Sequence, residues 1–278
     1  MGVPLRFAVM GNPIAHSLSP MIHRLFAEQT GCVLSYDKMK IDLPAFEPQV
    51  AQFFDEGGLG LNITQPFKQR AFLISQDKTA RCWSAGAANT LWRDKTGRLQ
   101  ADNTDGVGLL RDLTRHMDLP GQRVLLLGAG GAARGILAPL LASGIQSLTI
   151  VNRTLSAAHA LCQAFEHHAA RSLLTVADIA ELNAPFDIIL NATSASLQDN
   201  PLALPSRLIM PPTVCYDLSY RLNGDTPFVA WARAQGSQGI DGLGMLVEQA
   251  AEAFFIWHGV MPNTTRVLAC LVRKVTHV

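Results

Sequence analysis

Hydrophobic residues in the first third of the chain form short runs separated by polar turns, and the spacing within each run indicates its structure. Apolar positions at helical spacing follow Ser19 and Pro20, which suit the N-cap and the first position of a helix. A second helix is predicted over residues 44–54 and stops before Gly57. Strands are predicted over residues 5–11 (LRFAVMG), 33–41 (VLSYDKMKI) and 59–64 (LGLNIT), and a hairpin over NTLWRDKTGRLQADNTD.

From Asp105 onward the pattern changes to repeated strand-then-helix units. Alternating strands and helices predict a parallel, doubly wound sheet. The strands of these units lie in RVLLLGAGGAARGILAPLLASG, SLTIVNRTLSAAHALCQAFEHH, FDIILNATSAS and VCYDL. Two more helices are predicted near the end of the chain, over residues 243–258 and 265–274.

The chain therefore has an α/β fold with two domains. Residues 1–104 form an N-terminal α/β domain, and residues 105–242 form a Rossmann-type, doubly wound domain. The helices within residues 243–278 are expected to return to the first domain. A cleft between two such domains is a common place for a small ligand.

Composition and charge limit the kind of partner. Of the 278 residues, 48% are hydrophobic and 16% are charged, and the net charge is +1, which fits a compact soluble protein without a nucleic-acid partner. No apolar run approaches the roughly 18 residues that a membrane span needs. The five cysteines form no CxxC pair, which favours a reducing compartment over a disulfide framework or a zinc ribbon. We expect a cytoplasmic protein.

A glycine-rich turn opens the second domain. The segment Gly128-Ala129-Gly130-Gly131-Ala132-Ala133 fits GxGxxA between a strand and a helix. The first glycine permits a tight turn, the second lets a pyrophosphate approach, and the alanine keeps the helix close to the strand. The free N–H groups at the start of the helix then face the phosphates. The segment predicts a dinucleotide site.

The next strand ends in Asn152-Arg153-Thr154, where a chain that binds NAD usually carries an acid for the ribose hydroxyls. Arg153 would instead pair with a 2′-phosphate through a charge-assisted hydrogen bond, with Asn152 and Thr154 adding further bonds. NADP is therefore favoured over NAD. The alternative is a surface arginine at the end of a strand.

Three polar segments of the first domain each lie at the end of a predicted strand and are expected to face one crevice. They supply hydroxyls, amides, Lys68 and Asp105, which suit a small polyhydroxylated acid. A lysine next to a carboxylate can also take the hydroxyl proton in an alcohol oxidation. From the residues alone, a surface position for Lys68 is equally expected. The segments are GNPIAHSLSP, NITQPFK, and Asn89-Thr90 together with DNTDG.

These motifs resemble those of the shikimate dehydrogenase family. The resemblance covers nearly the whole chain and includes, in the family's order, GNPIAHSLSP, NITQPFK, GAANT, DNTDG, GAGGAAR, VNRT, NATS and DGLGMLVEQAA. It implies NADP-dependent interconversion of shikimate and 3-dehydroshikimate in aromatic amino-acid and chorismate biosynthesis. The first domain, with the C-terminal helices, would then bind the substrate, and the second would bind NADP. A monomer and a homodimer both stay open.

The resemblance also implies roles for single residues. Lys68 would pass the C3 hydroxyl proton, and Asp105 would hold both the lysine and a substrate hydroxyl. The remaining substrate-binding residues would be Ser17 and Ser19 at the carboxylate, Tyr220 near it, and Asn62, Thr64, Asn89 and Gln249 around the ring. The NADP-binding residues would be Gly128, Ala129, Gly130, Gly131 and Ala132 at the pyrophosphate, Asn152, Arg153 and Thr154 at the 2′-phosphate, and Thr193, Leu218 and Gly242 at the nicotinamide.

Three positions depart from the family's pattern. Ala157 stands where a second basic residue often brackets the 2′-phosphate, so the preference for NADP is expected to remain but to be weaker by about one order of magnitude or more. Leu218 replaces a methionine at similar volume, and Gln65 replaces a small residue without an evident reason.

Other functions are weighed on the same residues. A quinate dehydrogenase that uses NAD is the nearest rival, and Arg153 and Ser17 favour shikimate over it. A catalytically silent NADP-binding regulator would be expected to lack Lys68 or Asp105, and both are present. A metal enzyme is disfavoured, because His16 and His23 have no acidic or cysteine neighbours that would complete a metal site.

Overall fold

The computed structural model describes residues 4–166, 168–193, 195, 204–221 and 223–275. The chain divides into two compact units, the first formed by Met1–Leu109 with Leu246–Val278 and the second by Leu110–Met245. The sequence had placed the changes of domain at residues 104 and 242. The predicted class, an α/β fold with two domains, is confirmed.

The first unit is built on a six-stranded sheet in the order β2-β1-β3-β5-β6-β4. β1 lies between β2 and β3 and is parallel to both, whereas β5 runs antiparallel to its neighbours β3 and β6. The strands are β1 (Leu5–Gly11), β2 (Leu34–Lys40), β3 (Gly58–Ile63), β4 (Asp77–Lys78), β5 (Thr90–Arg93) and β6 (Leu99–Asp102).

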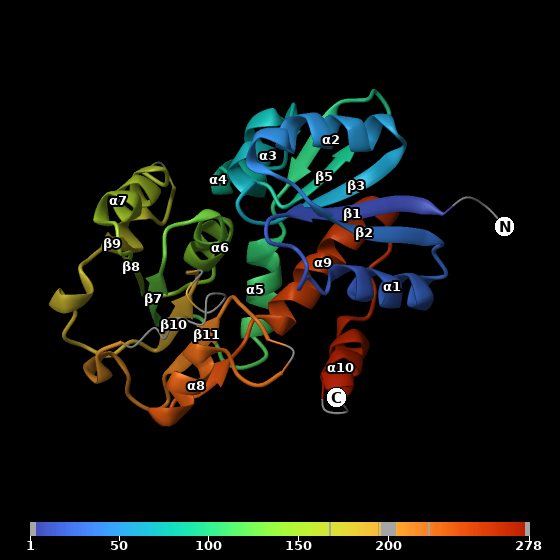
Figure 1. The fold of residues 1–278 in the computed structure, drawn as a ribbon. Helices are drawn as coiled ribbons and strands as arrows, with labels where there is room; N and C mark the ends of the chain where they lie inside the picture. Colours follow the sequence, from blue (N-terminus) through green and yellow to red (C-terminus); the bar gives the residue numbers. More distant parts are fainter. Residues whose placement is uncertain (1–3, 167, 194, 196–203, 222, 276–278) are drawn as a thin grey trace. The chain divides into compact units, whose positions relative to one another are not determined.

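Helices cover both faces of this sheet, because side chains alternate along each strand. Ala8 and Met10 of β1 pack with Phe46 and Val50 of α2 (Phe46–Asp55), which lies above the sheet in Figure 1, and with Phe67, the residue before α3 (Lys68–Ile74). The side chains between them point to the other face, where a smaller cluster includes Phe7 and Val9, with Trp257 packed against it. The helices are α1 (Ser19–Thr30), α2 (Phe46–Asp55), α3 (Lys68–Ile74), α4 (Ala80–Ala85), α5 (Asp105–Leu113), α9 (Leu243–His258), α10 (Thr264–Val275) and the short 3₁₀ turn η1 (Leu43–Ala45).

The second unit is a parallel sheet in the order β12-β11-β10-β7-β8-β9. Counted from β7, this is the 3-2-1-4-5-6 order of a dinucleotide-binding fold, which reverses between β7 and β10. Ligands of such sheets bind beyond the carboxyl ends of the strands at this reversal. The strands are β7 (Arg123–Leu127), β8 (Ser147–Val151), β9 (Leu174–Val176), β10 (Ile188–Asn191), β11 (Val214–Asp217) and β12 (Gln238–Ile240).

The strands of this sheet are apolar almost throughout, as expected for a sheet that is covered on both faces. Leu125, Ile189 and Cys215 pack on one face against Phe228 and Ala232 of α8. The helices are α6 (Gly131–Ala142), α7 (Leu155–Gln163), α8 (Pro227–Ala234) and the short 3₁₀ turns η2 (Arg171–Leu173), η3 (Ile179–Glu181) and η5 (Ser206–Leu208).

Local details differ from the sequence prediction. Ser19 was expected at the N-cap of α1, but the cap is Leu18 and Ser19 is already helical, because its hydroxyl pairs with that of Ser17 instead of capping the helix. The short helices α3 and α4 were not predicted, since neither is long enough to show a helical period. Ser194 and Ser196, at the end of the expected strand segment FDIILNATSAS, lie outside the described residues.

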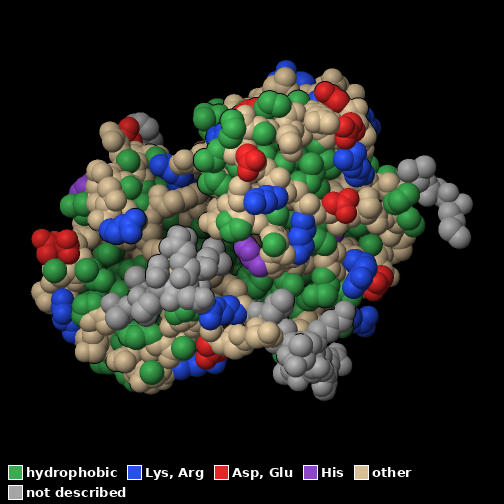
Figure 2. All heavy atoms as spheres, in the orientation of Figure 1, with side chains coloured by type: hydrophobic (Ala, Val, Ile, Leu, Met, Phe, Trp, Pro, Cys, Tyr) green, Lys and Arg blue, Asp and Glu red, His purple; other side chains and the backbone are tan. Residues whose placement is uncertain are grey.

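The surface carries charges of both signs. On the face drawn in Figure 2, basic and acidic side chains are interspersed with apolar and neutral ones. Of the helices in the described ranges, none combines the length and the apolar character that a membrane crossing requires.

Candidate active site

A row of polar side chains crosses one edge of the first unit's sheet. Asn62 at the end of β3 is in register with Thr90, and Thr90 is in register with Asp102 at the end of β6. Asn89 and Thr90 open β5 and do not end it. Because β5 runs antiparallel to its neighbours, its start lies beside their ends, and all three polar segments reach the same edge.

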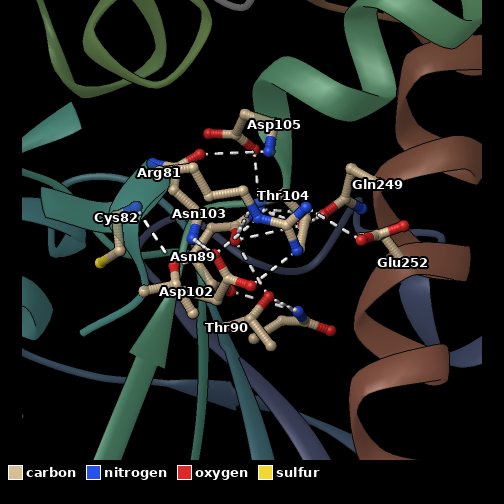
Figure 3. A network of polar contacts seen from close by, with 12 residues as sticks. Arg81, Cys82, Asn89, Thr90, Asp102, Asn103, Thr104, Asp105, Gln249 and Glu252 are labelled. Atoms are coloured by element: carbon tan, nitrogen blue, oxygen red, sulfur yellow. Dashed lines mark hydrogen bonds and ion pairs between the residues drawn. The ribbon is translucent and has the colours of Figure 1, made fainter. Parts of the chain in front are cut away.

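Hydrogen bonds join this row into one network (Figure 3). Thr90 Oγ1 donates to Asn89 Oδ1 at 2.9 Å, and Asn62 Nδ2 lies 3.2 Å from Thr90 Oγ1. On the far side of Asn62, the Tyr36 hydroxyl donates to Oδ1 at 2.7 Å. Asn62 and Asn89 are both buried, so their orientation is set by protein partners before any ligand arrives.

Asn89 lies at the centre of the network. Its Nδ2 lies within 2.8 Å of Asp105 Oδ1, 2.9 Å of Thr104 Oγ1 and 3.2 Å of Gln249 Oε1. An amide nitrogen carries only two hydrogens, so it cannot satisfy all three acceptors at once. Gln249 Oε1, the most distant of the three, therefore has acceptor capacity for a hydroxyl of a ligand. Its other contact in the network is Thr104 Oγ1 at 3.4 Å.

Lys68 and Asp105 form an ion pair, with Lys68 Nζ 2.5 Å from Asp105 Oδ2. The lysine side chain is 16% exposed and the aspartate 5%, so the carboxylate is enclosed and the ammonium retains a path to a ligand. Each residue is the first of its helix, α3 or α5. The start of a helix stabilises the negative charge of Asp105, and Asn89 adds a hydrogen bond to its second oxygen.

Ser17 and Thr64 lie on two loops that are close to each other through the backbone, and Ser19 is the first residue of α1. The Thr64 N–H donates to Met10 O at 2.9 Å, and the Thr64 methyl group is so close to Gly11 that a Cβ there would lie 2.3 Å from it. Ser17 Oγ lies 3.2 Å from Ser19 Oγ. Ser17 also lines a pocket of about 450 Å³ between α1 and β2, together with Leu18, Pro20, Met21, Arg24, Leu34, Tyr36 and Lys38.

Tyr36 and His23 form an aromatic wall behind Asn62 and were not among the predicted site residues. Their rings stack with centroids 4.2 Å apart. Burial holds the Tyr36 pKa well above its usual value, and burial, assisted by His258, lowers the His23 pKa to about 3. Both side chains are therefore neutral at physiological pH. Tyr36 is 26 residues from its partner Asn62, and the sequence gives no signal of that contact.

The glycine turn of the second unit fits a pyrophosphate. Gly128 has φ +106°, and a Cβ there would lie 3.1 Å from the Ala192 carbonyl group across the β7–β10 reversal. A Cβ on Gly130 would meet no atom within 4 Å, so space is open beside the backbone where α6 begins. Gly131 and Ala132 are the first residues of that helix and Ala129 precedes it, so their N–H groups are available to phosphate oxygens.

Asn152, Arg153 and Thr154 lie next to this turn, because the Gly128 N–H donates to Val151 O at 2.8 Å. Asn152 Nδ2 donates to Thr154 O at 2.8 Å, and Thr154 is the N-cap residue of α7. Arg153 is exposed, and nothing in the described part of the chain pairs with its guanidinium group. Ala157 lies in the first turn of α7. The arrangement provides one cation beside the turn.

Thr193, Leu218 and Gly242 gather beyond the ends of β10 and β11. Thr193 Oγ1 donates to Asn191 Oδ1 at 2.7 Å, and the Leu218 N–H donates to Asn191 O at 2.9 Å. A Cβ on Gly242 would lie 2.3 Å from Leu218 O, so only glycine allows this approach. The buried Asp217, which sequence reasoning missed, accepts hydrogen bonds from Asn191 and from the Thr226 hydroxyl. Tyr220 follows on the same segment and is half-buried.

Neither a metal site nor a disulfide is found among the described residues. In the described ranges, no group of three or more His, Cys, Asp or Glu side chains could hold a metal ion. His23 is buried among aromatic rings. All five cysteines are free thiols.

Three family models match successive parts of the chain. The shikimate dehydrogenase substrate binding domain matches residues 9–91, the shikimate/quinate 5-dehydrogenase model matches residues 112–199, and the shikimate 5′-dehydrogenase C-terminal domain matches residues 242–269. A curated protein from Legionella pneumophila (strain Corby), named shikimate dehydrogenase (NADP(+)), is 51% identical over 263 residues, which are 95% of this chain and 97% of the relative.

Solved structures agree with these matches. A shikimate 5-dehydrogenase from Thermus thermophilus, in complex with NADP(H) and shikimate, is 32% identical with a TM-score of 0.84 and covers 98% of this chain and 99% of its own. An Ael1 enzyme from Pseudomonas putida is 46% identical with a TM-score of 0.86, over 96% of this chain and 98% of its own.

Proposed function

The chain belongs to the shikimate dehydrogenase family, and on that premise we propose that it interconverts shikimate and 3-dehydroshikimate with NADP as the hydride carrier. The observation that carries the proposal is the enclosed Lys68–Asp105 pair, which Asn89 holds at the polar edge of the first unit's sheet. Chorismate and aromatic amino-acid biosynthesis is then the pathway that the enzyme serves.

We assign the substrate to the first unit. The hydroxyls of Ser17 and Ser19 bind its carboxylate, and Thr64 binds the ring. Asn62 and Asn89 are held by the network and are assigned to the ring hydroxyls on the resemblance. Gln249 Oε1 accepts from a hydroxyl, since Asn89 cannot satisfy it fully. Tyr220, from the second unit, is assigned to the neighbourhood of the carboxylate on the resemblance alone.

Proton transfer is assigned to Lys68. In the oxidation, the Lys68 ammonium first releases its proton to solvent, and the neutral amine then takes the C3 hydroxyl proton as hydride leaves C3. In the reduction, the ammonium donates a proton to the oxygen that becomes the C3 hydroxyl. Asp105 holds the lysine with Oδ2 and accepts from a substrate hydroxyl, while its other oxygen is held by Asn89. The charge of Asp105 stabilises the protonated lysine that oxidation produces.

We assign NADP to the second unit. When bound, NADP supplies the hydride acceptor for the oxidation. The backbone of residues 128–132 holds the pyrophosphate, Arg153 with Asn152 and Thr154 holds the 2′-phosphate, and Thr193, Leu218 and Gly242 surround the nicotinamide. The open space at Gly130 and the unpaired N–H groups at the start of α6 support this assignment.

A second candidate is a dehydrogenase of broader cofactor use that also accepts quinate. One observation favours it: Arg153 is a single exposed cation, and Ala157 offers no second one. A catalytically silent regulator is disfavoured by the intact Lys68–Asp105 pair. We place the enzyme in the cytoplasm, because its five free thiols fit a reducing compartment.

A matrix of initial rates tests the proposal, with shikimate and quinate each offered NADP and NAD, read by the absorbance of the reduced nicotinamide. We expect fast turnover with shikimate and NADP, and slower turnover in the other three combinations. Comparable rates with NAD or with quinate would establish the second candidate. Lack of turnover in all four combinations would contradict both dehydrogenase candidates and would favour the catalytically silent regulator.

A further inference from the structure

A cluster of charged side chains lies behind the candidate active site and is not used by the reaction described above. Arg81, in the first turn of α4, holds Asp102 with both ends of its guanidinium group, Nε to Oδ1 at 2.7 Å and NH2 to Oδ2 at 2.6 Å. Its third nitrogen, NH1, donates to Glu252 Oε1 of α9 at 2.9 Å. Figure 3 shows the guanidinium group between the two carboxylates.

One arm of this cluster leads to the catalytic aspartate. Asp102 Oδ1 accepts the Asn103 N–H at 2.7 Å, and Asn103 Oδ1 accepts the Asp105 N–H at 3.1 Å. Asn103 Nδ2 donates to Ala87 O at 2.8 Å, next to the segment that carries Asn89. Asp102 is 4% exposed on its side chain and also accepts from Thr79 Oγ1 at 2.6 Å, so its position depends on protein partners and not on water. Arg81 thereby fixes the turn from which Asp105 starts α5.

The other arm leads to the substrate amide. Glu252 follows Gln249 by three residues on α9, so the two side chains lie on the same face of that helix. Gln249 Oε1 meets Asn89 and Thr104 in the network, while Glu252 meets Arg81 behind it. The ion pair between Glu252 and Arg81 therefore fixes the position of α9 along its axis and its rotation about that axis, and so the position of Gln249 relative to Asn89.

We propose that Arg81 is a positioning residue with two separable arms, in which Asp102 aligns Asp105 for proton transfer and Glu252 aligns Gln249 for recognition of a substrate hydroxyl. The inference rests on the proposed function. Surface ion pairs contribute little to stability, but here the three side chains are 29%, 4% and 11% exposed, and removal of one partner takes away a bond that orients the enclosed charges of the others. The expected consequence is displacement of the attached segment.

The two arms predict different kinetic results. Glu252→Ala is expected to raise the KM for shikimate about 10-fold, with kcat and the KM for NADP changed less than about 3-fold. Glu252→Gln keeps the volume and an acceptor for Arg81, and it is expected to recover most of that affinity. Arg81→Lys cannot hold Asp102 with two parallel bonds, and it is expected to lower kcat as well.

A double-mutant cycle of Glu252 and Gln249 shows whether Glu252 acts on substrate binding through Gln249 or only supports the fold. Once Gln249 has been replaced by alanine, adding Glu252→Ala should raise the KM for shikimate by less than about 2-fold, because the residue through which Glu252 acts is gone. Arg98→Ala is the matched control. It breaks an exposed pair with Asp77 near the other end of β6, and kcat and both KM values should stay unchanged.

Several outcomes of these kinetic measurements would overturn the positioning role of Arg81. Equal increases in the KM for shikimate from Glu252→Ala in the wild-type and Gln249→Ala backgrounds would overturn the inference, and so would parallel increases in the KM values for shikimate and NADP. If Glu252→Ala does not fold, the Arg81→Lys enzyme carries the test, and unchanged KM for shikimate and kcat in that enzyme would overturn the inference. If the wild-type protein does not turn over shikimate, the proposed function itself is contradicted. If the wild-type enzyme is active and Glu252→Ala has the same kinetics, only the positioning inference is contradicted, and the proposed function stands.

Discussion

The proposed substrate site of the first unit and the proposed NADP site of the second unit are built from different kinds of groups. In the first unit, the substrate-binding groups are side chains that are buried and bonded to one another, from Tyr36 through Asn62, Thr90 and Asn89 to Asp105. In the second unit, the groups assigned to the phosphates of NADP are mainly backbone N–H groups of a glycine turn and an exposed arginine. The substrate-binding side chains of the first unit form one hydrogen-bond network, whereas the groups assigned to the phosphates in the second unit are independent contacts.

This difference determines how each half responds to substitution. Residues in one hydrogen-bond network couple, because the loss of one partner leaves the others without theirs. Independent contacts each contribute their own increment to affinity. The first unit should therefore show large, non-additive losses in catalysis and substrate binding. The second should show moderate changes that are confined to the cofactor and add in free energy.

The largest expected effect is that of Lys68→Ala. A positioned acid–base group contributes about 10²–10⁴-fold to the rate, so kcat should fall by that factor while the KM for shikimate changes little. Asp105→Asn should also reduce kcat, because the amide no longer stabilises the ammonium group. Steady-state rates over a range of shikimate concentrations measure both effects.

The double variant tests the coupling between the two residues. If Lys68 and Asp105 act as one unit, adding Asp105→Asn to Lys68→Ala should reduce kcat by much less than the same change does in the wild type. Losses that multiply in full would mean that the two side chains act separately. A large rise in KM with kcat intact in Lys68→Ala would reassign the lysine to substrate binding.

The next largest effect is expected at Arg153. Arg153→Ala should lower kcat/KM for NADP about 10-fold and leave kcat/KM for NAD unchanged, because only NADP carries the phosphate that the guanidinium group pairs with. Ala157→Arg should raise the NADP-to-NAD ratio by about the same factor, since it restores a second cation in the first turn of α7.

These two substitutions also test additivity. In the independent-contact view, Ala157→Arg should compensate Arg153→Ala almost fully, because the two free-energy changes are opposite and about equal and should sum to within a few tenths of a kcal/mol unless the two side chains share the phosphate. An unchanged NADP-to-NAD ratio in Arg153→Ala would show that NRT is not the phosphate site.

The second unit was the easier half to predict from sequence. Its site depends on local signals: a glycine with φ +106° at the end of a strand, a helix that begins shortly afterwards, and a second strand that ends in a cation. Each signal is short and contiguous, so it can be read along the chain. The strand order that places Gly128 beside Ala192 follows from general rules for such sheets.

The network of the first unit was only partly predictable. Its polar segments could be located, and the strands that end at Gly11 and near Thr64 were expected. The contacts that orient them join residues far apart: Tyr36 to Asn62, Arg81 to Glu252 across 171 positions, and Asn89 to Gln249 across 160. A single sequence carries no signal of such pairs, because any buried polar residue must find a partner but several could serve.

A matched pair of tyrosines compares the units directly. The hydroxyl of Tyr36 donates to Asn62 at 2.7 Å, and that of Tyr216 donates to Asp112, also at 2.7 Å. Both rings are buried, so Tyr→Phe should cost about 1–3 kcal/mol of stability at either place. Only Tyr36→Phe should also raise the KM for shikimate, by about 5-fold, since it frees the Asn62 amide to turn. Equal KM values in the two variants would show that Asn62 does not depend on Tyr36 for its orientation.

The smallest effect on turnover is expected from His23→Phe, which keeps a ring stacked on Tyr36 and changes how stability depends on pH. Burial lowers the His23 pKa from 6.5 to about 3 in the folded state. Between these values the unfolded chain binds a proton at His23 that the folded chain does not bind. The contribution of the neutral His23 to the free energy of unfolding is therefore fully present above pH 6.5 and is lost as the pH falls from 6.5 toward 3. One such group contributes a slope of about 1.4 kcal/mol per pH unit.

Urea unfolding at pH 8, 6.5 and 5.5 measures this slope. The difference between wild type and His23→Phe at pH 8 reports packing alone, because the imidazole is neutral in both states there. As the pH falls to 5.5, the wild type should lose more stability than the variant by about 1 kcal/mol. Parallel curves for the two proteins would mean that His23 gains its proton in the folded state as readily as in the unfolded chain, and the aromatic wall behind Asn62 would then be open to water.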